Sequence, residues 1–499
     1  MKIITFCFIK LFIFSLLGSG LISCYEDTNF LVWGPGLQPH IVTTPARYFF
    51  IEALDKNQKR VFVPPESIKV VITGESQYGS CRIWINKLDR KDGSYIIRYK
   101  LYYPCHNLRI DVKINKEHIA DSPYIIPETV YNEECYCPST SVEDFLSAYG
   151  CKLPYKQIAS DLKPFNNVDM NKIRDTIQNK FNAPGSYSIC NYVIKNNEIY
   201  RKCYGQHVGF KMFVDAILLS LARKIYLPDT EFWTNLGDWP LIKSSEELLP
   251  MFSWCGSKDT YDIVMPTYDI TESTLENMGR VMLDMLSVQG NIEKTWEEKL
   301  PQAFWRGRDS SRERLVLIDL SQKYPELFNA SITNYFFFRE KEEIYGKSPH
   351  ISFFKFFNYK YQLNIDGSVA AYRFPYLLIG DSAVFKQDSP YYEHFYNMLE
   401  PGKHYIPVKR DLSDLVKQIQ WAIDNDDIAR NISMEGYKWA RDNLMPTDIY
   451  CYHMSLINEW SKKVGNDINI LDDMERVPQP VPDKHYGECK CVKNIKDEL

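Results

Sequence analysis

The sequence predicts a multi-domain protein in which a small β-sandwich precedes a larger α/β region. Between about residues 30 and 127, short runs alternate apolar and polar side chains, and the turns between them are rich in Pro, Gly and Asp. After Pro138 the pattern changes to helical segments alternating with short apolar runs, which is typical of α/β architecture. A chain of 499 residues that is 45% hydrophobic can bury large cores, so we expect two or three globular units.

Five alternating runs predict the strands of the sandwich. They cover residues 47–53, 67–73, 82–88, 95–101 and 108–114. The dipeptide Asp92-Gly93 between two of these runs predicts a tight hairpin, because glycine accepts the positive φ of such a turn. Cys81 and Cys105 are equidistant from Gly93, so a hairpin centred there would set them opposite each other. A disulfide between these two cysteines is therefore a hypothesis.

Short apolar runs predict the strands of the α/β region, and longer periodic segments predict its helices. The predicted strands are residues 231–235, 303–306, 361–365, 382–386 and 404–408. The predicted helices are residues 208–224, 275–288 and a pair within 413–444, and Ser141 with Asp144 indicates a capped helix start. The remainder of the chain, with a Pro-rich run at 477–482, predicts an exposed tail.

The two ends of the chain indicate where the protein resides. Lys2 precedes an apolar run at residues 3–17, and small residues follow it, so residues 1–23 predict a secretory signal peptide. The last four residues, Lys496 to Leu499, form a KDEL terminus, which a retrieval receptor reads as an address. Together the two ends predict a soluble resident of the endoplasmic reticulum lumen with the KDEL receptor as a partner.

Charge and cysteine content narrow the class of protein further. The 59 basic and 64 acidic residues are spread along the whole chain, so no basic face predicts nucleic-acid binding. Past the leader no apolar stretch approaches the roughly 20 residues that a membrane span needs, so we expect no membrane insertion. An oxidising lumen favours disulfides over metal sites at the C-x-C pairs 135–137 and 489–491. Asn329 and Asn431 begin glycosylation sequons.

Well-marked catalytic motifs are absent, because the chain has no G-x-G-x-x-G, P-loop, G-x-S-x-G or H-E-x-x-H sequence. The strongest local candidate is residues 364–373, where a predicted strand meets Asp-Gly-Ser and then a helix-forming run. Such a junction leaves backbone N–H groups free to bind a diphosphate, although an ordinary capped helix would have the same pattern.

Two further segments carry candidate chemistry. Arg306, Arg308 and Arg312 surround a glycine and two serines, and guanidinium groups can fork onto phosphate oxygens, although loop arginines are often solvated or paired with surface acids. Asp238, in a Gly-Asp-Trp-Pro turn after a predicted strand, could act as a general base or could satisfy only its own turn. The D-x-D sequence at 424–426, a pattern that some sugar transferases use for manganese, is interpreted as a solvated turn.

These segments carry two family resemblances. Gly34-Pro-Gly-Leu37, residues 45–51, Asp92-Gly93-Ser94-Tyr95 and residues 114–124 resemble a filamin-type immunoglobulin repeat. From about residue 135 to 465 the chain resembles glycosyltransferase family 90, the Rumi and capsule-associated group. The segments that carry this second resemblance are residues 227–229, 237–240, 261–267, 304–307, 366–373 and 404–408. With the KDEL end, the whole chain resembles the KDEL motif-containing protein O-glucosyltransferase family.

The resemblance implies a fold, a reaction and a domain order. The fold would be two Rossmann-like halves in the GT-B arrangement, and the reaction the inverting transfer of glucose from UDP-glucose to serine on EGF-like domains, without a metal. The domains would be a signal peptide at 1–23, the filamin-type repeat at 24–130, the transferase at 131–465 and the tail with its retention signal at 466–499. Whether xylose can replace glucose stays open. The alternative is a catalytically inactive resident chaperone or scaffold that binds clients through the sandwich.

The resemblance also implies roles for individual residues. Asp238 would be the base, and Arg306 and Arg308 would bind the diphosphate, with Arg312 as the alternative to Arg308. The remaining residues expected to bind the nucleotide sugar are Asp366, Gly367, Ser368, Val369, Ala370, Ala371 and Arg373.

Overall fold

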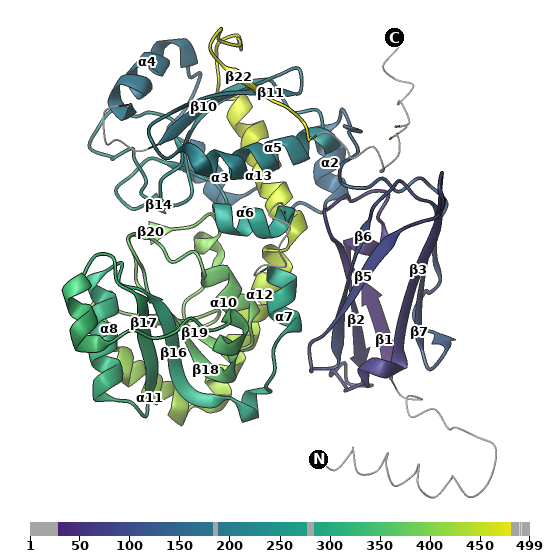
Figure 1. Ribbon diagram of the computed structural model, residues 1–499, viewed down its shortest axis with the longest axis vertical. Coiled ribbons are helices and arrows are strands. Elements are labelled where there is room, and N and C mark those ends of the chain that lie inside the picture. Colours follow the sequence, from purple (N-terminus) through teal and green to yellow (C-terminus); the bar gives the residue numbers. More distant parts are fainter. Residues whose placement is uncertain (1–27, 183–187, 277–283, 481–488, 490, 492–499) are drawn as a thin grey trace, which may run out of the picture.

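The computed structural model describes residues 28–182, 188–276, 284–480, 489 and 491. It shows a β-sandwich lying along one side of a larger α/β region with two halves, one above the other in Figure 1. The predicted signal peptide and the KDEL terminus lie outside the described residues. Among the described helices, none combines the length and the apolar character needed to cross a membrane.

The sandwich consists of two antiparallel sheets that face each other (Figure 1). One sheet has the order β1 (Asn29–Trp33), β2 (Arg47–Leu54), β6 (Ser94–Leu101), β5 (Ile83–Asp89). The other has the order β4 (Gly79–Ser80), β3 (Ile68–Ser76), β7 (His106–Ile114), β8 (Glu117–His118), and β9 (Tyr124–Ile126) also pairs with β7. The five strands predicted from alternation are confirmed as β2, β3, β5, β6 and β7. Each buries one line of apolar side chains in the core between the sheets.

The predicted hairpin and disulfide both form, but the hairpin does not create the disulfide. Gly93 has φ 86°, and a Cβ there would lie 2.3 Å from a backbone oxygen, so only glycine fits. The register pairs Ile83 with Leu101, which centres the hairpin on Asp92, one residue before Gly93, and would bring Cys81 opposite Tyr103 rather than Cys105. The bond between Cys81 and Cys105 forms where the chain passes from one sheet to the other, because β5 and β6 belong to one sheet and β4 and β7 to the other.

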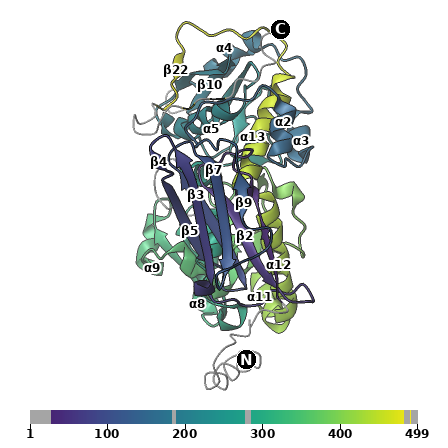
Figure 2. The ribbon, with the colours of Figure 1, turned by 90° about the vertical axis from the view of Figure 1, so that its right-hand side faces the viewer.

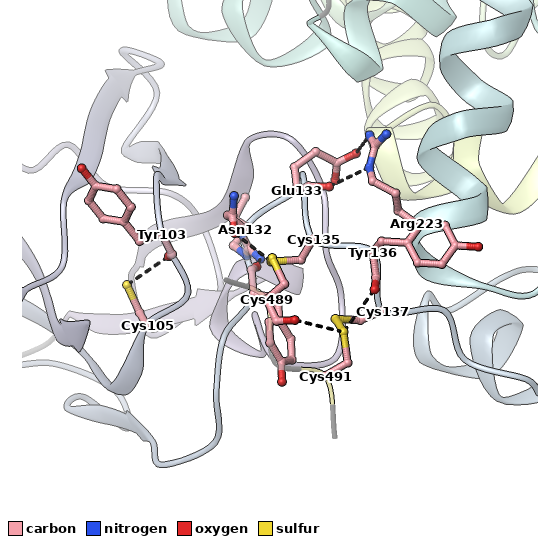
Figure 3. Close-up of a disulfide and its surroundings, with 12 residues drawn as sticks. Tyr103, Cys105, Asn132, Glu133, Cys135, Tyr136, Cys137, Arg223, Cys489 and Cys491 are labelled. Atoms are coloured by element: carbon pink, nitrogen blue, oxygen red, sulfur yellow. Dashed lines mark hydrogen bonds and ion pairs between the residues drawn. A yellow bond between two sulfur atoms is a disulfide. The ribbon is translucent and has the colours of Figure 1, made fainter. Parts of the chain in front are cut away.

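The end of the chain is tied to the segment that follows the sandwich. Cys135 bonds to Cys489 and Cys137 bonds to Cys491, so both C-x-C pairs are used in disulfides (Figure 3). Strand β22 (Glu475–Val477) adds to the edge of β11 (Glu198–Tyr204). Residues 466–480 are mostly exposed, as predicted, but the tail is attached to distant parts of the chain. Such long-range pairing gives no local signal in the sequence. Two more disulfides join Cys151 to Cys451 and Cys190 to Cys203.

The upper half of the α/β region in Figure 1, here the N-terminal half, is built on a mixed sheet. Its order is β15 (Ile263–Val264), β13 (Phe252–Ser253), β12 (Thr230–Asn235), β10 (Ile189–Lys195), β11, β22. Only β12, β13 and β15 run parallel, so the expected Rossmann-like half is present there and is extended by an antiparallel hairpin and β22. Its helices are α2 (Val142–Ala148), α3 (Lys156–Leu162), α4 (Met170–Phe181), α5 (Lys211–Lys224), α6 (Tyr268–Leu275) and α13 (Pro446–Ser461).

The lower half, here the C-terminal half, has a fully parallel sheet. Its order is β17 (Phe328–Asn334), β16 (Leu300–Arg308), β18 (Tyr359–Asn364), β19 (Ala383–Gln387), β21 (Ile406–Val408). In chain order this is 2-1-3-4-5, so the direction of winding reverses between β16 and β18. Doubly wound sheets bind ligands at the carboxyl ends of the strands on either side of such a reversal. The predicted arginine segment and the Asp-Gly-Ser segment follow these two strands.

Helices cover both faces of this sheet, as alternate residues of β16 show. Ala303 and Trp305 pack in one core with α8 (Arg312–Lys323) and α11 (Leu415–Asp424), whereas Phe304 packs in another with α10 (Phe374–Ile379). Helix α12 (Asp426–Asn443) contributes to both cores, and α9 (Glu342–Tyr345) is a single turn. A short antiparallel ribbon of β14 (Gly256–Ser257) and β20 (Tyr391–Tyr392) joins the two halves.

The predicted helix at 275–288 is interrupted within the described residues, although Leu275 and residues 285–288 are helical as predicted. Helix α6 ends at Leu275, because Glu276 has the left-handed φ of 52°. Helix α7 (Met285–Gly290) begins after Asp284, whose carboxylate accepts the N–H groups of Leu286 and Ser287. The left-handed Glu276 ends one helix and the Asp284 side chain caps the start of the next, and apolar periodicity alone did not reveal either feature. The predicted Ser141 cap and the helix pair α11 and α12 are confirmed.

Candidate functional site

Arg314 holds together the loops that follow β16 and β18. It lies on α8 and is buried, and its guanidinium donates to the backbone oxygens of Ile365 at 3.0 Å, Asp366 at 2.9 Å and Arg308 at 3.0 Å, and to Ser310 Oγ at 2.9 Å. Burial lowers the pKa of Arg314 to about 9, which leaves it charged at neutral pH. Sequence reasoning missed this residue, although it lies two positions after Arg312 in the predicted arginine segment.

The loop 366–373, here the donor loop, supplies backbone N–H groups. Helix α10 begins only after Arg373, so the predicted junction is a loop rather than the immediate start of a helix. Asp366 donates its N–H to Gln387 Oε1 at 2.9 Å, and its carboxylate accepts a hydrogen bond from the Ser389 hydroxyl. Within the described chain, residues 368–373 donate no backbone N–H to another protein group. These groups therefore have no protein acceptor, and their binding of an anion stays a prediction.

The two predicted arginines of β16 have different surroundings. The Arg306 guanidinium donates to the backbone oxygen of Asn329 at 2.8 Å and to its Oδ1 at 2.6 Å, within the sheet. Arg308 is exposed at the carboxyl end of β16, with its guanidinium carbon 5.2 Å from the centre of the Phe336 ring. No carboxylate of the described residues forms an ion pair with Arg308. Arg308 is therefore free to contact a diphosphate, whereas Arg312 is the first residue of α8. Diphosphate contacts by Arg306, Arg308 or Arg312 stay predictions.

Arg373 connects the donor loop to the end of β16. Its Nη1 donates to the backbone oxygen of Arg306 at 2.5 Å. Burial lowers the pKa of Arg373 to about 10, while the carboxylate of Asp269, on α6 of the N-terminal half, acts in the opposite direction. A charge of one half therefore faces a charge of the other half next to the donor loop.

Asp238 lies in the loop after β12 and reaches the same region from the N-terminal half. Its backbone oxygen accepts hydrogen bonds from Cys255 Sγ at 3.4 Å and from the Tyr372 hydroxyl of the donor loop at 3.5 Å. The residue as a whole is exposed, yet enough protein surrounds its carboxyl group for burial to raise the pKa. No side chain of the described residues hydrogen-bonds this carboxylate. Asp238 is thus free to accept a proton beside the donor loop.

Tyr268 lies at the centre of this arrangement. Its ring is 5.6 Å from that of Tyr372, centroid to centroid. Burial raises the pKa of Tyr268, and the charges of Asp238, Arg308 and Glu393 all act on its hydroxyl. The predicted base Asp238 and the predicted diphosphate residue Arg308 therefore both lie within electrostatic range of the Tyr268 hydroxyl. Glu393 was not among the predicted site residues.

The remaining predicted residues have distinct environments. Asn329 is half-buried in β17, and its amide both accepts from Arg306 and donates to the Tyr359 hydroxyl at 2.9 Å, whereas Asn431 is exposed on α12. The 424–426 sequence lies between α11 and α12 as predicted. Asp426 is not a freely solvated carboxylate, however, because it accepts hydrogen bonds from Trp296 Nε1 at 2.9 Å and from the Lys360 ammonium at 2.6 Å. In the described part of the chain, no group of three His, Cys, Asp or Glu side chains is placed to hold a metal ion.

Family models match both regions of the chain. The glycosyl transferase family 90 model matches residues 147–492, and the filamin/ABP280 repeat model matches residues 26–125. The chain therefore belongs to glycosyltransferase family 90 and carries an N-terminal filamin repeat.

Within this family, the chain is similar to protein O-glucosyltransferases. Protein O-glucosyltransferase 2 of Danio rerio is 48% identical over 475 residues, and protein O-glucosyltransferase 3 of Homo sapiens is 45% identical over 478 residues. Each of these alignments covers 94% of both proteins. Protein O-glucosyltransferase 1 of Homo sapiens is 29% identical over 334 residues, which cover 64% of this chain and 83% of that protein. The resemblance inferred from the motifs is confirmed over nearly the whole length.

Proposed function

We propose that this protein transfers glucose from UDP-glucose to serine hydroxyl groups of EGF-like domains, with inversion at the sugar carbon. The observation that carries the proposal is the contact between Asp238 of one half and Tyr372 of the donor loop in the other half, next to the reversal of strand order where Arg308 ends β16. The relatives named protein O-glucosyltransferase 2 and 3 support a protein acceptor and a glucosyl donor.

The residues have complementary roles in a single displacement. Asp238 takes the proton from the serine hydroxyl as its oxygen bonds to the anomeric carbon, and the bond from that carbon to the UDP oxygen breaks at the same time. Arg308 and the backbone N–H groups of the donor loop stabilise the charge that develops on the departing UDP. The guanidinium and N–H groups carry this charge, so the proposal requires no metal.

The location follows from the two ends of the chain. The predicted signal peptide and the KDEL terminus support residence in the endoplasmic reticulum lumen, with retrieval by the KDEL receptor. Five disulfides among the described residues suit an oxidising compartment.

The proposal is tested by incubating the purified chain with folded EGF-like domains and a panel of UDP-sugars, followed by mass spectrometry of the domains. A hexose mass on a serine that appears only with UDP-glucose supports the proposal. A pentose mass with UDP-xylose would extend the donor range. Binding of the domains without any sugar transfer would contradict it and support the chaperone alternative.

A further inference from the structure

Lys386 is a buried cation without a charged partner in the described structure. It lies near the carboxyl end of β19, opposite Asn364 of β18, and is 9% exposed. Its ammonium lies 4.5 Å from the ring centre of Tyr396 and 5.7 Å from those of Phe374 and Tyr405. Its only hydrogen bond within the described residues is a long one, of 3.4 Å, to a neighbouring backbone oxygen.

Glu393 is a fully buried acid close to Lys386. It directly follows β20, the strand of the ribbon that joins the two halves. Its Oε1 accepts a hydrogen bond from the Tyr396 hydroxyl at 3.1 Å, whereas its Oε2 is buried and has no hydrogen-bond partner in the described part of the molecule. Tyr396 therefore contacts both the cation and the acid.

Burying ionisable groups lowers the stability of the fold unless a partner or a ligand satisfies their hydrogen bonds or charge. Ionisable side chains inside proteins are normally paired or fully hydrogen-bonded, and an unpartnered buried atom lowers stability. Burial raises the pKa of Glu393 to about 8, so at neutral pH the carboxyl group is mostly protonated and can both donate and accept. Burial lowers the pKa of Lys386, whereas the carboxylates of Asp366 and Asp388 raise it.

The pair lies beside the donor loop. Asp366, the first residue of that loop, donates its N–H to Gln387, the neighbour of Lys386, and Phe374, whose ring lies against the ammonium, directly follows the loop. Tyr268, which packs against Tyr372 of the loop, lies within electrostatic range of Glu393, Asp238 and Arg308. The pair thus lies beside the loop assigned to the nucleotide sugar.

We propose that Lys386 and Glu393 bind hydroxyl groups of the sugar that is transferred. A sugar hydroxyl can accept a hydrogen bond from the ammonium and donate one to Glu393 Oε2, which satisfies both groups at once. A diphosphate is a less suitable ligand for this pair, because it only accepts hydrogen bonds and the nearby Asp366 carboxylate would repel it. The diphosphate is better placed at Arg308, which has no carboxylate paired with it among the described residues. This inference rests on the proposed function and names residues that recognise the donor.

Glu393→Gln and Lys386→Met test the pair in the full-length chain. Calorimetry would measure the affinities for UDP and for UDP-glucose. We expect the affinity for UDP to stay within about twofold of the unmodified chain and that for UDP-glucose to fall about tenfold, the loss of one hydrogen bond to a buried group. The melting temperature should stay constant for Glu393→Gln, which keeps the volume of the side chain, and stay constant or rise for Lys386→Met, which removes an uncompensated buried ammonium.

Lys360→Met is the matched control. Lys360 belongs to β18 of the same sheet and also lies against an aromatic ring, 5.1 Å from the centre of Trp296, but its ammonium is paired with Asp426 at 2.6 Å. Its removal should lower the melting temperature and leave the ratio of UDP-glucose to UDP affinity unchanged.

Two results would overturn the inference. Lower melting temperatures for both variants with an unchanged affinity ratio would make the pair structural, and an equal loss of UDP and UDP-glucose affinity would make it part of the diphosphate site. If the unmodified chain instead prefers another UDP-sugar, the proposed donor fails, but the affinity ratio for that sugar still tests the pair.

Discussion

Buried ionisable side chains have ion-pair partners in one region of the molecule and lack them in another. Where the sandwich meets the C-terminal half, Arg98 lies 3.1 Å from Asp284, and the same carboxylate caps α7. Beside the donor loop, Lys386 and Glu393 are as deeply buried, but neither has a charged partner within the described residues. The ion pair of Arg98 and Asp284 is part of the contact that holds the sandwich in place. Lys386 and Glu393 have no such structural partner, and we infer that they bind a ligand. The comparison predicts that changes in the first region affect stability and changes in the second affect binding.

Asp238→Asn should have the largest effect, because it removes the proton acceptor while keeping nearly the same volume. Glucosyl transfer should fall by roughly 10²- to 10⁴-fold, the range for general-base catalysis. UDP affinity and melting temperature should stay close to those of the unmodified chain. Transfer within a few-fold of the unmodified rate would remove Asp238 as the base and direct the search to other acids of the site.

The pH profile sharpens the same assignment. Only the ionised carboxylate accepts a proton, and burial raises the pKa of Asp238 above the usual value for aspartate. Transfer should therefore fall as the pH is lowered, starting at a higher pH than an ordinary aspartate would give. The asparagine variant should lose this acidic limb, which a rate profile of both proteins would show.

Arg98→Met should remove the ion pair with Asp284, and we expect the next largest effect, on the stability of the fold. It leaves Asp284 largely buried without its cation, and the loss of one partner of a buried pair costs about 3 kcal/mol. We expect a lower denaturation midpoint with UDP affinity unchanged. A loss of UDP affinity with unaltered stability would contradict the division between the two regions.

The regions also differed in how well the sequence predicted them. The sandwich strands are local alternations, so β2, β3, β5, β6 and β7 were predicted within a few residues. The arrangement around the donor loop is assembled by contacts far apart in the chain, such as that between Arg314 and Ile365. Motifs located Asp238, Arg308 and the donor loop. No local pattern marks a lysine as unpaired, however, and none indicated Lys386.

Arg308→Ala should weaken UDP binding by about 2 kcal/mol, the range for a hydrogen bond to a charged group. Arg306→Ala should mainly lower the melting temperature, because its guanidinium is engaged by Asn329 within the sheet. Calorimetry with UDP in excess EDTA measures both variants and the need for a metal. Loss of UDP affinity in EDTA for the unmodified chain would contradict the metal-free proposal, and equal losses in both variants would restore Arg306 to the diphosphate site.

The two sequons should differ in glycan occupancy, with the smallest effect on function. Asn431 is exposed on α12, so its amide nitrogen is free to carry a glycan. The Asn329 amide instead donates to the Tyr359 hydroxyl and accepts from Arg306 in β17, and a glycan there would displace the first bond. Asn431→Gln should increase gel mobility of the secretory-pathway protein and leave transfer unchanged, whereas Asn329→Gln should leave mobility unchanged. A glycan on Asn329 in the active enzyme would show that β17 forms without this bond.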